Sequence, residues 1–119
     1  MGDQFVGKWK MVHSDGYEEF LRVLGIPWLT RKAAVASPPT LEITKSANSW
    51  QIKTESTFKT SVIVFSLGQE FEEERMDGEK IKSTVTLENN VMIQRSKGSV
   101  DHTITREVAN EVLKIVTIY

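Results

Sequence analysis

The segment from Phe5 to Leu24 constrains the fold of this chain more than any other stretch. Phe5, Trp9 and Met11 alternate along one face of a predicted strand, and a predicted helix follows almost at once. Asp15 is the expected N-cap of that helix, with Glu18 in the first turn. The apolar stripe of the helix consists of Tyr17, Phe20, Leu21 and Leu24. A short helix between a first strand and further strands predicts a β-barrel with a helical lid.

The remaining chain alternates turn signals with short apolar runs. Gly25 is the expected end of the first helix, and Pro27 the start of a second that runs to Ala36. Asp77-Gly78 is a strong hairpin signal. Strands are predicted at 40–45, 50–54, 60–67, 71–75, 80–87, 91–95, 102–108 and 111–119. About nine strands on short turns predict an all-β, antiparallel up-and-down barrel with a helix–turn–helix lid, in one domain spanning residues 1–119.

Composition excludes several classes of function. With 15 basic and 16 acidic residues, the formal net charge is −1, which argues against a nucleic-acid partner. The chain contains no Cys, so thiolate metal sites and a cysteine nucleophile are excluded. His13 and His102 lack partners at metal-ligand spacing, and no nucleophile elbow is present. We therefore expect no metal, no cofactor and no enzymatic activity. The absence of Cys and of an apolar leader predicts a cytoplasmic protein.

Arg106 is the residue that carries a functional hypothesis. Alternation along 102–108 places it on the same face as Ile104 and Val108, which is the apolar face. A buried guanidinium requires a counter-charge. The neighbouring strand presents no carboxylate on its inward face, which consists of Leu113, Ile115, Thr117 and Tyr119. A ligand carboxylate, bound by the guanidinium fork, would supply the missing charge.

Two other interpretations of Arg106 remain open at this point. A shift of one residue in register would turn Arg106 to solvent, because side chains alternate between the two faces of a strand. An internal acid such as Glu73 could also provide the counter-charge.

Several motifs resemble those of the intracellular fatty-acid-binding proteins. The resemblance covers the chain from Phe5 to about Tyr119. The N-terminal motif is Gly7-x-Trp9-x-Met11-x-x-Ser14-x-Gly16-Tyr17-Glu18-x-Phe20-Leu21-x-x-Leu24. Others are Thr30-Arg31-Lys32, Glu55-Ser56-Thr57-Phe58-Lys59, Leu67-Gly68-Gln69-Glu70-Phe71, Asp77-Gly78-x-Lys80-x-Lys82-Ser83 and Thr103-x-x-Arg106-Glu107.

This resemblance implies a ligand site inside the barrel, in which Arg106 binds the carboxylate of a long-chain fatty acid. It implies lid and portal residues at Tyr17, Leu21, Leu24, Ile26, Thr30 and Ala34. Phe58 would contact the acyl chain, with Lys59 and Asp77 nearby. Thr54, Ser56, Ile104, Ile115 and Thr117 would line the cavity.

One departure from the family pattern concerns the end of the sequence. The family ends in a strand that carries Arg-x-Tyr, and Tyr119 falls where the preceding strand ends. We therefore expect the first and last strands of this chain to be left as open edges.

The resulting hypothesis is a monomeric, cytoplasmic lipid chaperone that carries a long-chain fatty acid or a similar carboxylated lipid. Arg22, Arg31 and Lys32 would form a basic face on the lid, and in some members of the family such a face is linked to transient membrane contact or entry into the nucleus. For these three charges, the alternative is an ordinary solvated face. The alternative to a lipid chaperone is a truncated barrel that serves as a protein-interaction module with weak or no lipid binding.

Overall fold

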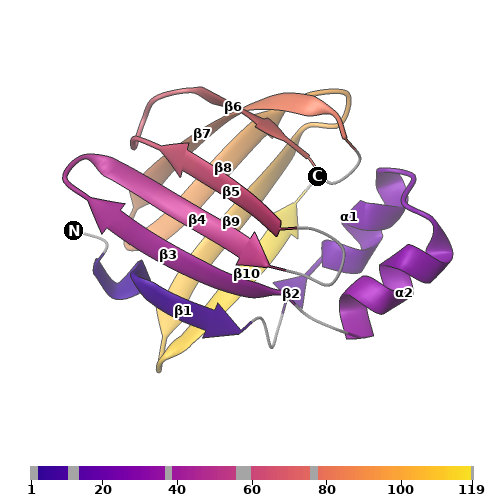
Figure 1. Ribbon diagram of the computed structural model, residues 1–119, viewed down its shortest axis with the longest axis horizontal. Coiled ribbons are helices and arrows are strands. Elements are labelled where there is room, and N and C mark those ends of the chain that lie inside the picture. Colours follow the sequence, from indigo (N-terminus) through magenta and orange to yellow (C-terminus); the bar gives the residue numbers. More distant parts are fainter. Residues whose placement is uncertain (1–2, 11–13, 37–38, 56–59, 76–77, 119) are drawn as a thin grey trace.

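The computed structural model describes residues 3–10, 14–36, 39–55, 60–75 and 78–118. Two curved sheets face one another, and a pair of helices lies across one end of them (Figure 1). The first sheet is antiparallel and has the order β1-β3-β4-β5. Its strands are β1 (Gly7–Lys10), β3 (Thr40–Ser46), β4 (Ser49–Glu55) and β5 (Thr60–Phe65).

The second sheet has the order β2-β10-β9-β8-β7-β6. All neighbours in it are antiparallel except β2, which runs parallel to β10. Its strands are β2 (Ser14–Asp15), β6 (Phe71–Glu74), β7 (Lys80–Glu88), β8 (Val91–Lys97), β9 (His102–Ala109) and β10 (Val112–Ile118). Each predicted strand from residue 40 onward is present, with bounds shifted by a few residues.

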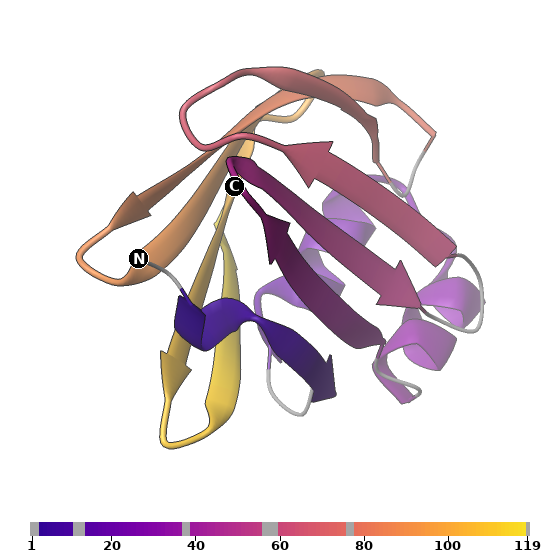
Figure 2. The same ribbon diagram turned by 60° about the vertical axis from the view of Figure 1, so that its left-hand side comes forward.

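The predicted antiparallel barrel with a helical lid is confirmed, although hydrogen bonds do not close it within the described residues. Figure 2 shows how the two sheets curve toward each other. β5 and β6 belong to different sheets, and so do β1 and β10. The expected open edge of β10 is partly occupied, because β2 pairs with it at Ile115 and Val116. Within the described residues, this pairing links the N-terminal segment to β10 by hydrogen bonds.

The structure corrects three details of the N-terminal segment. Phe5 ends a short 3₁₀ helix, η1 (Asp3–Phe5), and is not part of the first strand. Met11 lies outside the described residues. Asp15 is in β2 and does not cap the first helix; the N-cap is Gly16, which makes no side-chain hydrogen bond. Pairing with β10 holds Asp15 in an extended conformation, and local sequence patterns do not reveal such a long-range contact.

The two helices of the lid begin and end where turn chemistry indicates. α1 (Tyr17–Val23) is followed by Gly25 at a φ of 81°, a left-handed conformation that glycine adopts readily. α2 (Trp28–Ala36) starts after Pro27, whose carbonyl accepts a hydrogen bond from the Arg31 amide. Among the described residues, no helix is both long and apolar enough to cross a membrane.

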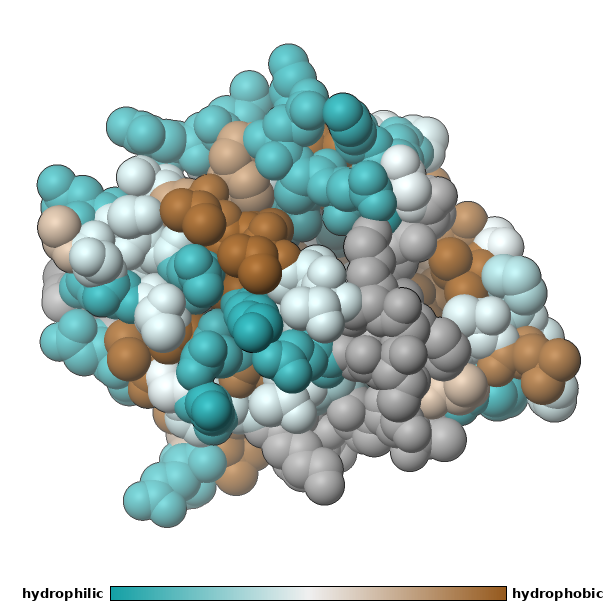
Figure 3. Space-filling model, viewed as in Figure 1, coloured by the Kyte–Doolittle hydropathy of each residue, from teal (hydrophilic) through white to brown (hydrophobic). Residues whose placement is uncertain are grey.

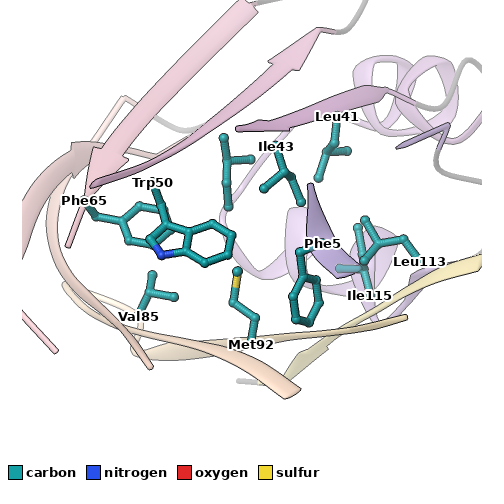
Figure 4. Packing of buried hydrophobic residues seen from close by; sticks show 10 residues of the cluster. Phe5, Leu41, Ile43, Trp50, Phe65, Val85, Met92, Leu113 and Ile115 are labelled. Atoms are coloured by element: carbon teal, nitrogen blue, oxygen red, sulfur yellow. The ribbon is translucent and has the colours of Figure 1, made fainter. Parts of the chain in front are cut away.

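The core lies between the sheets, and side chains from both sheets contribute to it. Ile43 and Trp50 come from the four-stranded sheet, and Val85 and Met92 from the six-stranded sheet. Phe5 enters this cluster beside Met92, Leu113 and Ile115 (Figure 4). The ring of Phe5 therefore joins the N-terminal segment to β10 by packing, next to the place where β2 joins it by hydrogen bonds.

Candidate functional site

Arg106 lies inside the barrel. Its neighbours across the sheet are Met92 on β8 and Ile115 on β10, and both of these are buried. Arg106 itself is only 7% exposed, which excludes the interpretation that it faces solvent. Burial lowers the pKa of Arg106 to about 10, and the negative charge of Glu73 opposes this shift. The guanidinium remains a cation at neutral pH.

Gln94 connects Arg106 to Glu73. Nη1 of Arg106 donates to the Gln94 side-chain oxygen at 2.9 Å, and Nε2 of Gln94 donates to Glu73 Oε2 at 2.6 Å. These side chains come from β9, β8 and β6, so the chain of hydrogen bonds runs along the six-stranded sheet. The internal acid considered from the sequence is therefore present near Arg106, and it acts through an amide.

One hydrogen-bonding position of Arg106 is still available. Its Nε–H is buried and has no hydrogen-bond partner among the described residues. A buried donor left unpaired costs about 1–3 kcal/mol, so an acceptor brought by a ligand would be stabilised there. A hydroxyl, carbonyl or carboxylate oxygen satisfies this requirement.

A pocket of about 150 Å³ lies under α1, lined mainly by the six-stranded sheet and also by Ser61 of the four-stranded sheet. Glu73 and Gln94, both members of the hydrogen-bonded chain, form part of its wall. Four of the residues selected from the sequence also line it, namely Leu21, Leu24, Ile104 and Thr117. The structure thus brings lid residues and sheet residues of the predicted set together around one hollow.

Of the other predicted site residues whose side chains the structure describes, none lines this pocket. Arg106 is among these, and it is joined to the pocket wall through Gln94. Ile26 and Thr30 are half-buried in the lid, Thr54 is half-buried on β4, and Ile115 belongs to the apolar core. Tyr17 and Ala34 lie on α1 and α2, at positions where the structure describes only the backbone. Ser56, Phe58, Lys59 and Asp77 fall outside the described residues.

An aromatic contact joins the lid to β9. The rings of Phe20 and His102 are tilted against each other with centroids 4.6 Å apart, and both residues are buried. Both also line the pocket. Such pairs contribute roughly 0.5–1.5 kcal/mol beyond burial of area. The contact holds α1 over the end of the barrel at which His102 begins β9.

Sequence reasoning missed two polar residues of the site. Gln94 alternates with Met92 and Ser96, all buried, but Val91 and Ile93 on the opposite face hid this signal. Arg75 is buried beside the pocket and pairs with Glu79 at 2.8 Å. Its guanidinium also donates to the Val100 carbonyl, so it fastens two turns to each other. A charged residue at the predicted end of β6 gave no indication of burial.

The lid carries paired charges and exposed apolar side chains. Arg22 pairs with Glu19, Lys32 pairs with Glu18 at 2.7 Å, and Arg31 donates to the Ile26 carbonyl. Trp28 and Leu29 on α2 are 60% and 75% exposed. Figure 3 shows hydrophobic atoms on the surface over the helical pair, at the right of the view.

These observations define a class: a small β-barrel with a helical lid, a pocket under the lid, and a buried arginine that is hydrogen-bonded to Gln94 in the pocket wall. The model of the lipocalin / cytosolic fatty-acid binding protein family matches residues 6–117. The chain belongs to this family, as the motifs predicted.

Individual relatives agree with the family match. Fatty acid-binding protein homolog 5 of Caenorhabditis elegans is 44% identical, over 97% of this chain and 86% of the relative. Sodium/calcium exchanger regulatory protein 1 of Doryteuthis pealeii is 44% identical, over 91% of this chain and 82% of the relative. A Schistosoma mansoni fatty acid binding protein, solved in complex with arachidonic acid, is 31% identical and has a TM-score of 0.87. The match covers 97% of this chain and 87% of that protein.

Proposed function

We propose that this protein binds a long-chain fatty acid or a similar carboxylated lipid non-covalently inside the barrel and carries it through the cytosol. Arg106 pairs with the carboxylate, and no bond is made or broken. The observation that carries this proposal is the buried Arg106 guanidinium, whose Nε–H has no acceptor among the described residues. The family membership and the relatives named as fatty-acid-binding proteins support it.

The two ends of the ligand contribute differently to the proposed complex. Burial of the acyl chain supplies about 0.8 kcal/mol per CH₂, reduced by the loss of chain and side-chain freedom. The guanidinium orients the head group, because charge-assisted hydrogen bonds to a carboxylate are short and directional. Contacts of Leu21 and Leu24 with the ligand in the pocket would place the lid over the bound lipid.

The first prediction tests the head-group assignment. Replacing Arg106 with glutamine should weaken binding of oleic acid by about 10- to 100-fold, because each tenfold corresponds to ~1.4 kcal/mol and hydrogen bonds to charged groups contribute about 1.5–3 kcal/mol. Dissociation constants are measured on delipidated protein by displacement of a fluorescent fatty acid.

Arg95→Gln is the matched control for this experiment. Arg95 also lies on a strand of the six-stranded sheet, but it is exposed and pairs with Glu88 at the surface. Its replacement should leave binding unchanged. Equal binding by Arg106→Gln and the unmodified protein would refute the head-group role. Failure of the unmodified protein to bind any fatty acid would favour an interaction module.

We further propose that α2 touches membranes during ligand transfer. Arg22 and Lys32 of the lid are paired with carboxylates and Arg31 donates to a backbone carbonyl, so the exposed apolar side chains of Trp28 and Leu29 are better suited to insert into the interface than a basic face is. Trp is also favoured at the level of lipid head groups.

The second prediction tests this contact. Replacing both Trp28 and Leu29 with serine should slow transfer of a fluorescent fatty acid to vesicles several-fold, because less apolar area enters the interface. Val62→Ser with Val64→Ser is the control, since these side chains are 51% and 56% exposed on β5. Transfer by collision would be contradicted if the Trp28 and Leu29 double variant transferred the fatty acid at the unmodified rate. A transfer rate that does not depend on vesicle concentration would contradict it as well.

A further inference from the structure

Arg106 has a resident counter-charge before any ligand binds. Gln94 uses its oxygen to accept from Arg106 and its amide nitrogen to donate to Glu73, at 2.9 and 2.6 Å. The chain of hydrogen bonds therefore links a guanidinium directly to an amide and indirectly to a carboxylate. Glu73 is half-buried on β6, whereas Glu72 and Glu74 on the same strand are exposed. Glu73 is the half-buried acid of β6 that accepts from Gln94, while Glu74, although exposed, also contributes to the pocket wall.

This arrangement matters for the charge of the head-group site. A ligand carboxylate at Arg106 Nε would place a second negative charge near a cation that Glu73 already compensates. Two carboxylates that share one buried cation repel each other, and interior charges are weakly screened. An uncharged head group with an acceptor oxygen, such as an alcohol, satisfies the same Nε–H without adding charge.

We propose that Glu73 is a specificity-determining residue, which acts through Gln94 on Arg106 and reduces the preference for fatty acids over neutral lipids of equal chain length. The inference rests on the proposed function, because it concerns the same head-group site. It assigns to this chain a ligand range that extends from fatty acids to fatty alcohols. The negative charge of Glu73 acts in two ways: it compensates the charge of Arg106 through Gln94, and it repels a second carboxylate at the same site.

The experiment compares oleic acid with oleyl alcohol, which share one acyl chain and differ in the head group. Dissociation constants for both are measured on the unmodified protein, on Glu73→Gln and on Glu72→Gln. Glu73→Gln should raise the ratio of acid affinity to alcohol affinity by about tenfold, a difference of ~1.4 kcal/mol. Glu72→Gln removes a charge from the outer face of the same strand and should leave the ratio unchanged.

A second pair of variants keeps the inference testable if Glu73→Gln does not fold, because it leaves Arg106 uncompensated. In Arg106→Gln, Glu73 alone should repel the acid. Adding Glu73→Gln to Arg106→Gln removes that repulsion and should restore acid binding by about tenfold, with alcohol binding unchanged. Equal acid binding by the single and the double variant would overturn the inference.

The outcomes separate this inference from the proposed function. If the unmodified protein binds oleic acid and Glu73→Gln leaves the affinity ratio unchanged, Glu73 has no role in specificity and the proposed function stands. If the unmodified protein binds neither lipid, both the proposed function and the inference are wrong. A larger ratio in Glu73→Gln but not in Glu72→Gln supports both.

Discussion

Replacing Phe5 with alanine should lower the free energy of unfolding by about 3–5 kcal/mol, the usual cost of truncating a buried aromatic side chain. Phe5 is fully buried, and its ring lies beside Met92, Leu113 and Ile115 (Figure 4). Its backbone carbonyl accepts the hydrogen bond from the Trp9 indole at 2.9 Å, and the substitution leaves that carbonyl in place. The loss therefore reports the packing of the ring.

Truncation of Phe5 should also weaken the contact between the N-terminal segment and β10. In the described residues, β2 is the hydrogen-bonded connection between the N-terminal segment and β10, and it spans two residues. Phe5 supplies the apolar packing at the same seam. Phe5→Ala should therefore also speed hydrogen exchange of the β10 amides more than that of the β7 amides.

Val6→Ala is the control, since Val6 is the next residue and its side chain is exposed. Surface substitutions of this kind change stability by about 0.5 kcal/mol or less. Both variants are compared by urea unfolding with the slope checked for constancy. A loss below about 1 kcal/mol for Phe5→Ala would show that the surrounding side chains close over the missing ring.

Much of the fold could be predicted because the turns of this chain are local signals. Gly25 and Pro27 mark the helix boundaries, and each predicted strand from residue 40 onward corresponds to one in the structure. The N-terminal segment was less predictable. Asp15 has the composition of an N-cap, yet a contact with β10, about a hundred residues away in sequence, places it in a strand. Sequence periodicity carries no information about such a pairing.

The candidate site shows the same limit. Alternation along β9 placed Arg106 inside, because Ile104 and Val108 fix which face is apolar. The partner of Arg106 could not be chosen on that basis. Gln94 and Glu73 lie on strands β8 and β6, and their side chains meet across the curved interior, without being neighbours in register with Arg106. Gln94 lies opposite Ile104 and so meets Arg106 diagonally, whereas β7 lies between the strands of Gln94 and Glu73. Periodicity along a single strand does not specify such partners.

Replacing Gly16 with alanine should lower the free energy of unfolding by about 2–5 kcal/mol, for two additive reasons. Gly16 has a φ of 78°, a left-handed conformation that costs other residues about 1–2 kcal/mol. A Cβ atom there would also lie 2.5 Å from the backbone oxygen of Thr117. Because that oxygen belongs to β10, it cannot swing aside as a side chain could, and overpacking of this kind costs about 1–3 kcal/mol.

Gly25→Ala separates the two contributions to the Gly16 result. Gly25 has nearly the same φ, 81°, but a Cβ there would meet no atom of the described residues within 4 Å. Its replacement should cost only the conformational term of about 1–2 kcal/mol. The loss for Gly16→Ala minus the loss for Gly25→Ala measures how tightly the start of α1 packs against β10. The contact is at Thr117, which lines the pocket. Equal losses of unfolding free energy in the two variants would mean that α1 moves away from Thr117 without an energetic penalty. Ligand exchange should then be equally fast in both variants.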